Sequence, residues 1–203
     1  LWTERPTLFT TIKNIMVNII NFSKMQALGN DFMVIDLINS DFLPNPGQIR
    51  FLSDRHYGVG FDQLLVIAAA MDSSHDYVYQ IFNADGSEVG QCGNGARCAF
   101  RYIKTHLNPG IHKLTLATKT TSIELEEVHS QLIKMSLPAP KFQPSTIPII
   151  AQQESMLYEL RSGLQVHALS VGNPHAIYLV QNNLWQLDLD ALGREISHHP
   201  LFP

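Results

Sequence analysis

A helix pattern set among short strand patterns is the feature that most constrains how this chain folds. Residues 93–106 (GNGARCAFRYIKTH) place Ala96, Ala99, Phe100 and Ile103 at i, i+3, i+4 and i+7, which is typical of a helix with one apolar face. The segments before and after it alternate apolar and polar residues, or run apolar, between tight turns. The sequence therefore predicts a strand-rich α+β fold.

The other expected elements follow from the same two periodicities. Strands are predicted where β-branched and apolar residues alternate or run together, and helices where apolar residues recur at helical spacing after a turn. The predicted strands cover 17–25, 31–38, 62–70 and 76–86, three short segments between 113 and 137, and two segments within 163–180; a short helix is predicted at 45–56, and a loop and helix at 183–199.

A proline-rich stretch divides the chain. Residues 137–148 (LPAPKFQPSTIP) hold four prolines in twelve residues, which is typical of a stiff, extended linker. We therefore expect a first domain at 16–136 and a partial second domain at 149–203, with 137–148 as the linker. Because Met16 opens the first strand pattern, residues 1–15 are expected to be a non-native extension.

Composition argues against several classes of partner. The 203 residues carry a formal net charge of -4 and form no basic stripe, which argues against nucleic-acid binding. No apolar run reaches the roughly 18 residues that a membrane span needs, so no membrane partner is expected. The two cysteines, six residues apart, do not resemble the disulfide framework of a secreted protein, so a reducing cytoplasm is the simpler expectation.

Both cysteines lie in the segment NADGSEVGQCGNGARC (83–98). Cys92 stands directly before the Gly-Asn-Gly that opens the predicted helix. Helix N-termini lower the pKa of a thiol, because unpaired N–H groups and the helix dipole favour negative charge there. The same N–H groups bind a carboxylate where glycines let the backbone approach closely. Cys92 is therefore predicted to be an activated thiol beside an anion site.

Each cysteine also has a structural explanation. Cys92 taken with one glycine alone would more often be a buried structural cysteine near a tight turn, and the Gly-Asn-Gly before a helix favours the functional interpretation. Cys98, which is followed by Ala99 and Phe100 on the predicted helix, is predicted to be an inert core thiol.

Five blocks of sequence, in order, resemble the diaminopimelate epimerase family of amino-acid epimerases. They are FSKMQALGNDFMVID, RHYGVGFDQLLV, NADGSEVGQCGNGARC, VGNPHAI and LGREISHHPLFP, and the similarity runs from about Asn18 to Pro203. The resemblance implies two pseudo-symmetric halves, the second incomplete here, each a mixed, mostly antiparallel sheet wrapped around a central helix. It also implies epimerisation of LL-2,6-diaminopimelate to the meso form, for lysine and peptidoglycan precursor synthesis, without a cofactor and in a homodimer.

The resemblance also assigns roles to single residues. Cys92 would be one of two catalytic thiols, and His175 matches a position that tunes thiol acidity. Each residue alone also has a structural explanation, such as turn formation by an asparagine or a core position for a histidine. The substrate contacts would come from the helix amides of Gly93 and Asn94, which would bind the α-carboxylate, and from the side chains of Asn30, Gln63, Asn83 and Asn173.

The sequence departs from the family at the second thiol. The family's second catalytic cysteine opens a similar helix in the second domain, but no cysteine follows Cys98 here. Cys98 lies six residues from Cys92, which is nearly two helical turns, and is not expected to take that role. We therefore expect a truncated epimerase that does not epimerise by itself and that exchanges an α-proton at one face at most slowly.

Other functions stay open on the residues alone. A proline or hydroxyproline racemase would share the fold type, and a non-catalytic protein would use the thiol and its glycine-rich turn to bind a small anion. A cysteine hydrolase would need a histidine oriented by a third group, which no spacing singles out. The two cysteines have an unusual spacing for zinc ligands, so no metal is expected.

Overall fold

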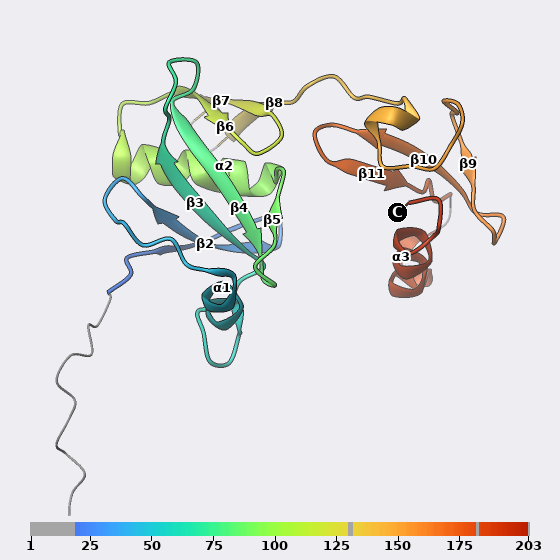
Figure 1. Cartoon of the computed structure of the whole chain (residues 1–203), viewed down its shortest axis with the longest axis horizontal. Coiled ribbons are helices and arrows are strands. Elements are labelled where there is room, and N and C mark those ends of the chain that lie inside the picture. Colours follow the sequence, from blue (N-terminus) through green and yellow to red (C-terminus); the bar gives the residue numbers. More distant parts are fainter. Residues whose placement is uncertain (1–18, 130–131, 182, 203) are drawn as a thin grey trace, which may run out of the picture.

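The computed structural model describes residues 19–129, 132–181 and 183–202, which form two parts (Figure 1). The N-terminal part, residues 19–136, contains a large sheet with a helix against it, and the C-terminal part, residues 141–202, contains a small sheet and one helix. Residues 137–140 join them without regular structure. The expected extension at 1–15 lies outside the described residues.

Eight strands form the sheet of the N-terminal part. Their order is β1-β2-β3-β4-β6-β7-β8, and β5 pairs with β4. The β2–β3 and β4–β6 pairs are parallel and the others are antiparallel, which confirms the mixed, mostly antiparallel sheet. The strands are β1 (Ser23–Ala27), β2 (Asn30–Asp36), β3 (Gln63–Ala69), β4 (Tyr77–Asn83), β5 (Glu88–Val89), β6 (Lys113–Ala117), β7 (Ser122–His129) and β8 (Leu132–Ser136).

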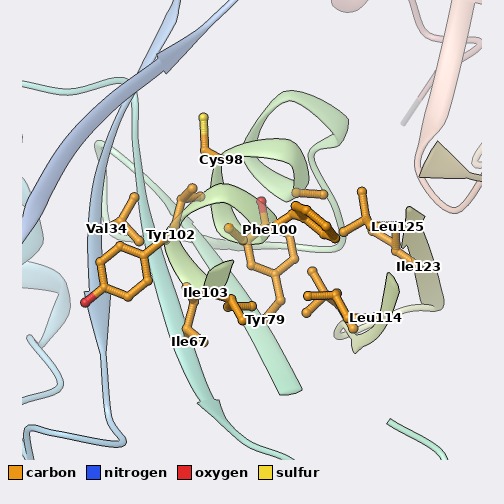
Figure 2. Packing of buried hydrophobic residues seen from close by; sticks show 14 of the residues in the cluster. Val34, Ile67, Tyr79, Cys98, Phe100, Tyr102, Ile103, Leu114, Ile123 and Leu125 are labelled. Carbon is orange, nitrogen blue, oxygen red and sulfur yellow. The ribbon is translucent and has the colours of Figure 1, made fainter. Parts of the chain in front are cut away.

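Helix α2 (Gly93–Tyr102) is the centre of this part. It contacts β1 and β8 at the two ends of the sheet as well as strands between them, so the sheet wraps around it. Figure 2 shows side chains of the sheet, such as Ile67 and Leu114, gathered around Phe100 and Ile103. Phe100 and Ile103 are fully buried, and burial of such a side chain contributes about 1.5–3 kcal/mol to folding. The predicted apolar face is therefore confirmed as the core of the fold.

The opposite face of the same sheet is covered by helix α1 (Pro46–Ser53). Asn45 caps this helix in a capping box with Gln48, in which each side chain bonds the other residue's backbone N–H. Ile49 is buried from the helix against sheet residues such as Leu64 and Val66. The even and odd positions of the central strands are therefore both buried, as their continuous apolar runs indicate.

The C-terminal part has a smaller core. Strands β9 (Tyr158–Glu159), β10 (Gln165–Ser170) and β11 (Pro174–Ile177) form an antiparallel sheet. Helix α3 (Leu189–Ser197) packs on it through Ile196. Two short 3-10 turns, Pro144–Thr146 and Leu184–Gln186, complete the part, and its buried residues are Ile147, Ile149, Tyr158, Leu160, Val166 and Ala168.

Several predicted elements have different bounds in the structure: the helix predicted at 45–56 ends at Ser53, and the strand predicted at 76–86 ends at Asn83. The strand predicted at 17–25 begins at Ser23, and the described residues before it, 19–22, are not strand. Ile20 instead packs partly buried against the core beneath α1. The helix predicted at 93–106 is α-helical only to Tyr102 and continues as a π-helical turn over Ile103–Leu107. No helix among the described residues is long and apolar enough to cross a bilayer.

Candidate active site

Three of the predicted site residues lie at one end of the large sheet, on the face that packs against α2. Strands β2 and β3 run parallel and begin at this end with Asn30 and Gln63, and the antiparallel β4 ends there with Asn83. Side chains two positions apart on a strand share a face. The neighbours two positions away on the three strands, Phe32, Leu65 and Ile81, all belong to the core around α2.

Cys92 is the N-cap residue of α2, at the same end of the fold. Its φ and ψ of -145° and 115° are extended, and its sulfur accepts a hydrogen bond from the N–H of Gly95 at 3.4 Å. The N–H groups of Gly93 and Asn94, the first two of the helix, have no hydrogen-bond partner among the described residues. The predicted arrangement of a half-buried thiol beside unpaired helix amides is therefore present.

A buried tyrosine supports this turn from the sheet side. The Tyr79 hydroxyl donates to the carbonyl oxygen of Cys92 at 3.3 Å, and burial raises the pKa of the phenol well above its usual value. A Cβ atom at Gly95 would lie 2.2 Å from the same hydroxyl oxygen. Gly95 is therefore required by the close approach of Tyr79 to the first turn of α2, which holds the thiol against the sheet.

The predicted amide residues are joined in pairs by hydrogen bonds. Asn94 Nδ2 donates to Asn30 Oδ1 at 2.8 Å, and Gln63 Nε2 donates to Asn83 Oδ1 at 3.0 Å. The first pair links the helix that carries the thiol to the edge of the sheet. The structure thus joins the start of α2 to Asn30, and it places Gln63 and Asn83 as a second pair at the same end of the sheet.

An ion-pair cluster fixes the strand ends that carry these amides. Asp31 accepts two hydrogen bonds from the Arg55 guanidinium, at 2.8 and 2.9 Å, and its backbone N–H donates to the carboxylate of Asp62. The hydrogen bonds that its carboxylate accepts, first of all from Arg55, hold the pKa of Asp31 well below its usual range. Because Asp31 and Asp62 are the chain neighbours of Asn30 and Gln63, the cluster sets the separation of those two site residues.

Gln91 connects the thiol turn to the C-terminal part, and the sequence analysis did not predict it. Its Nε2 donates to the carbonyl of Val171 at 2.6 Å and to Asn173 Oδ1 at 3.1 Å, and the Gln91 side chain is buried. The predicted site residue Asn173 therefore reaches the site through Gln91. The one available signal was the position of this polar residue directly before the thiol.

His175 lies away from the thiol's hydrogen bonds. Its ring is exposed, and Nδ1 lies 3.1 Å from the carbonyl oxygen of Asn173 in its own loop. The ring also lines an apolar hollow of the C-terminal part, together with Ile147, Ile196 and Phe202. Nothing in these contacts joins His175 to Cys92, so its role in thiol acidity stays a prediction.

Cys98 is a core residue, as the sequence predicts. It is 4% exposed within the cluster around α2, and burial raises the pKa of its thiol to about 11. A thiol in this state is a poor nucleophile and a poor base near neutral pH. The two cysteines therefore differ in kind, since Cys92 alone lies where a ligand's carboxylate would meet free N–H groups.

The geometry suits proton transfer at a carbon next to a carboxylate. The helix amides are oriented toward a negative charge, and the thiol lies beside them. The amide side chains of Asn94 and Asn30 lie at the start of the same helix and can donate to a carboxylate or accept from an ammonium group.

Comparison with known proteins identifies the family of the chain. A family model described as "Diaminopimelate epimerase" matches residues 22–141. A diaminopimelate epimerase of Legionella pneumophila (strain Corby) is 44% identical over 188 residues, which cover 91% of this chain and 68% of that protein.

Solved structures with low identity share the fold. An Agrobacterium radiobacter K84 protein described as a "probable proline racemase" has a TM-score of 0.63 at 11% identity, over 88% of this chain and 59% of that one. A hydroxyproline epimerase of Agrobacterium vitis has a TM-score of 0.54 at 12% identity, over 77% of this chain and 50% of that one. The expected α+β fold is confirmed by these likenesses, and the far higher identity to the Legionella enzyme decides the family. The chain belongs to the diaminopimelate epimerase family.

Proposed function

We propose that Cys92 is the base, or the acid, at one face of the α-carbon of diaminopimelate. Epimerisation of diaminopimelate by an isomerase is the activity that family membership supports, and it serves lysine synthesis. The single observation that carries the proposal is the thiol at the N-cap of α2 beside the unpaired N–H groups of Gly93 and Asn94. An α-carboxylate held by those two groups would present its α-carbon to the sulfur.

The proton transfer proceeds in two balanced steps. The Cys92 thiolate takes the α-proton, and the electron pair of the broken C–H bond moves into the carboxylate, which gains negative charge. The N–H groups of Gly93 and Asn94 stabilise that charge as it develops, which is where preorganised donors are most effective. A proton then returns to the carbon, from Cys92 at the same face or from a second acid at the opposite face.

Inversion needs the second acid, and Cys98 does not supply it. Cys98 lies in the core and holds its proton to about pH 11. We therefore expect the 203-residue chain, which carries no further cysteine, to exchange an α-proton with retention and not to invert the centre.

The remaining amide residues would hold the amino-acid groups of the substrate. Asn30, Gln63 and Asn83 lie at one end of the sheet, and Asn173 accepts a hydrogen bond from Gln91, the chain neighbour of Cys92. These uncharged groups bind ammonium and carboxylate groups without a large electrostatic penalty for either. His175 would act on the acidity of the thiol only through a rearrangement of its loop.

The test is hydrogen exchange at the α-carbon. The chain is incubated with LL-diaminopimelate in deuterated water, and deuterium incorporation and the LL-to-meso ratio are measured separately. Incorporation without inversion is expected, and the Cys92→Ser variant should lose the incorporation. Exchange that persists in Cys92→Ser, or full-rate inversion by the unaltered chain, would overturn the proposal.

A racemase of proline or hydroxyproline is the second candidate, because solved structures of similar fold bear such descriptions. Running the same exchange assay with L-proline and trans-4-hydroxy-L-proline separates the two. Exchange of diaminopimelate alone is expected.

The compartment and the assembly are part of the same proposal. A thiol that must be free to accept a proton has to stay reduced, which favours the cytoplasm. The homodimer, and the lack of nucleic-acid and membrane partners, stay predictions.

A further inference from the structure

Two chains of hydrogen-bonded side chains end at the candidate site. In the first chain, an Arg97 guanidinium N–H donates to Asn94 Oδ1, and Asn94 Nδ2 donates to Asn30 Oδ1 at 2.8 Å. A guanidinium has donors only, so it fixes which end of the Asn94 amide faces it. Asn94 must then donate to Asn30, and Asn30 is left with a free NH2 group.

The second chain is anchored by a carboxylate and runs the other way. Ser87 Oγ donates to Asp85 Oδ1 at 2.6 Å, so it accepts from Asn83 Nδ2 at 3.2 Å. Asn83 consequently turns its Oδ1 to Gln63, whose Nε2 donates to it at 3.0 Å. Gln63 is left with a free carbonyl oxygen. The hydrogen bonds from Ser87 hold the pKa of Asp85 below its usual value, so this anchor is ionised near neutral pH.

The two free ends are of opposite kind and lie on neighbouring strands. Asn30 opens β2 and Gln63 opens β3, both on the face toward α2. Within the described residues, neither the Asn30 NH2 group nor the Gln63 carbonyl oxygen has a hydrogen-bond partner. A cation therefore anchors the chain that ends in a donor, and an anion anchors the chain that ends in an acceptor.

We propose that Arg97 and the Ser87–Asp85 pair are positioning residues that fix the polarity of the site, so that Asn30 offers N–H groups to a carboxylate and Gln63 offers its carbonyl to an ammonium group. This rests on the proposed function, since both groups belong to one amino acid. A carboxylate only accepts hydrogen bonds and an ammonium group only donates them. An amide without such hydrogen bonds can turn either end to the ligand, and it loses that conformational freedom on binding. An amide that is already fixed avoids this entropic cost.

The direction of each hydrogen bond is measurable without any activity. In the unaltered chain labelled with 15N and 13C, scalar coupling across the hydrogen bond should join Asn94 Nδ2 to Asn30 Cγ, and Gln63 Nε2 to Asn83 Cγ. In Arg97→Glu the anchor becomes an acceptor, so the first coupling should reverse and run from Asn30 Nδ2 to Asn94 Cγ. Arg97→Lys should keep the original direction. Reversed couplings in the unaltered chain, or no reversal in a folded Arg97→Glu variant, would overturn the proposal.

Ligand binding gives a second, separate readout. Calorimetric titration with LL-diaminopimelate should show binding about tenfold weaker in Arg97→Met, as the loss of one hydrogen bond to a charged group predicts. Ser87→Ala should weaken binding severalfold, Ser87→Thr should restore it, and Arg97→Lys should stay within about threefold of the unaltered chain. Arg161→Met, which removes one positive charge from an exposed site in the C-terminal part, is the matched control and should have no effect.

The two readouts separate the proposals. Couplings in the stated directions with no binding of diaminopimelate would support the fixed polarity and count against the proposed substrate. Binding that is equal in Arg97→Met and in the unaltered chain would show that Arg97 does not position the site, whatever the substrate.

Discussion

Helices α2 and α3 begin alike and are packed very differently. Cys92 caps α2 through its sulfur at 3.4 Å, and Asp188 caps α3 through its carboxylate at 2.9 Å. Aspartate is among the best N-cap residues, whereas cysteine is not among the preferred ones. Helix α3 has no buried residue, while α2 buries Gly95, Ala96, Cys98, Ala99, Phe100 and Tyr102. Enclosure by the sheet therefore stabilises α2, so the helix does not need a strongly capping residue and its N-cap position can hold a reactive one.

The N-terminal and C-terminal parts of the chain also differ in their ion pairs. The N-terminal part contains ion pairs that tie strand ends together, such as Arg55 to Asp31 and Lys104 to Glu127. Residues 141–181 and 183–202, as described, form no ion pair among themselves. Both parts expose apolar side chains, such as Leu28 at 85% and Tyr57 at 83% in the N-terminal part and Leu179 at 67% and Trp185 at 91% in the C-terminal part. The part that carries the thiol is therefore the one whose segments are tied together by ion pairs, which helps to hold a site residue in position.

Replacing the thiol should have the largest effect and tests the contrast of the two N-caps. Cys92→Ser removes the proposed base, so α-proton exchange from diaminopimelate should fall by about 10²–10⁴-fold. Because serine is a good cap, the free energy of unfolding should change by less than about 1 kcal/mol. Exchange is followed by mass spectrometry in deuterated water, and unfolding by circular dichroism in urea.

The matched control for Cys92→Ser is the cap of α3. Asp188→Ala should cost about 1 kcal/mol of stability and leave exchange unchanged. If Asp188→Ala reduced exchange as much as Cys92→Ser, the division of roles between the two caps would be wrong.

Substitution of a core residue should lower the free energy of unfolding more on the enclosed helix α2 than on α3. Phe100→Ala opens a cavity in a fully buried site on α2 and should cost about 3–5 kcal/mol of unfolding free energy. Ile196→Ala, on the half-buried side of α3, should cost about 1–2 kcal/mol, because part of that side chain already faces water. Equal costs in the two variants, measured by urea unfolding, would contradict the difference in packing between α2 and α3. Phe51→Ala, at a largely exposed α1 position, is the control and should change stability by less than about 0.5 kcal/mol.

Sequence reasoning found the elements whose pattern is local. The run at 62–70 became β3, and the helix spacing after Cys92 became α2, because the periodicity that marks each element lies within its own segment of sequence. The strand predicted at 17–25 had a wrong start, because its pairing depends on the partner strand: Ser23 pairs with Val34 at the near end of the ladder. Local β-propensity does not contain that information.

The candidate site could be predicted from its motif residues, but the residues that orient them could not. Cys92 and its glycines carry a local signal, since a thiol before Gly-Asn-Gly has few structural uses. Gln91 had only its position before the thiol as a signal, because its partners Val171 and Asn173 lie 80 and 82 residues further along the chain. Tyr79 reads as an ordinary strand residue, and only its distance to Gly95 shows why that glycine is needed.

Gln91→Leu should loosen the contact between the two parts of the chain. The leucine keeps the volume but leaves Val171 O and Asn173 Oδ1 without their donor, which should cost about 1–3 kcal/mol. Since Gln91 Oε1 is buried without a partner, part of that cost is offset by its removal. Limited proteolysis at 137–140 should therefore become several-fold faster, and Gln153→Leu, at an exposed position, should leave the rate unchanged. An unchanged rate in Gln91→Leu would show that the contact does not hold the parts together.

Lowering the pH should have the smallest effect on stability, and this effect should come from the N-terminal part. The Arg55 guanidinium is the main cause that lowers the pKa of Asp31 in the folded state, below the ordinary value of about 3.9 for aspartate. A lowered folded pKa stabilises the protein at every pH above that ordinary value, and the contribution is lost as the pH falls further. Because Arg55 is 57% exposed, solvent screening limits the contribution to about 1 kcal/mol. Asp31→Asn should thus be about 1 kcal/mol less stable than the unaltered chain at pH 7, with the difference in stability closing near pH 2.

Urea unfolding at several pH values measures this difference, and Asp190→Asn on α3 should stay within about 0.5 kcal/mol of the unaltered chain at neutral pH. A gap for Asp31→Asn that does not change with pH would mean that shape, rather than charge, holds the strand ends on which Asn30 and Gln63 stand.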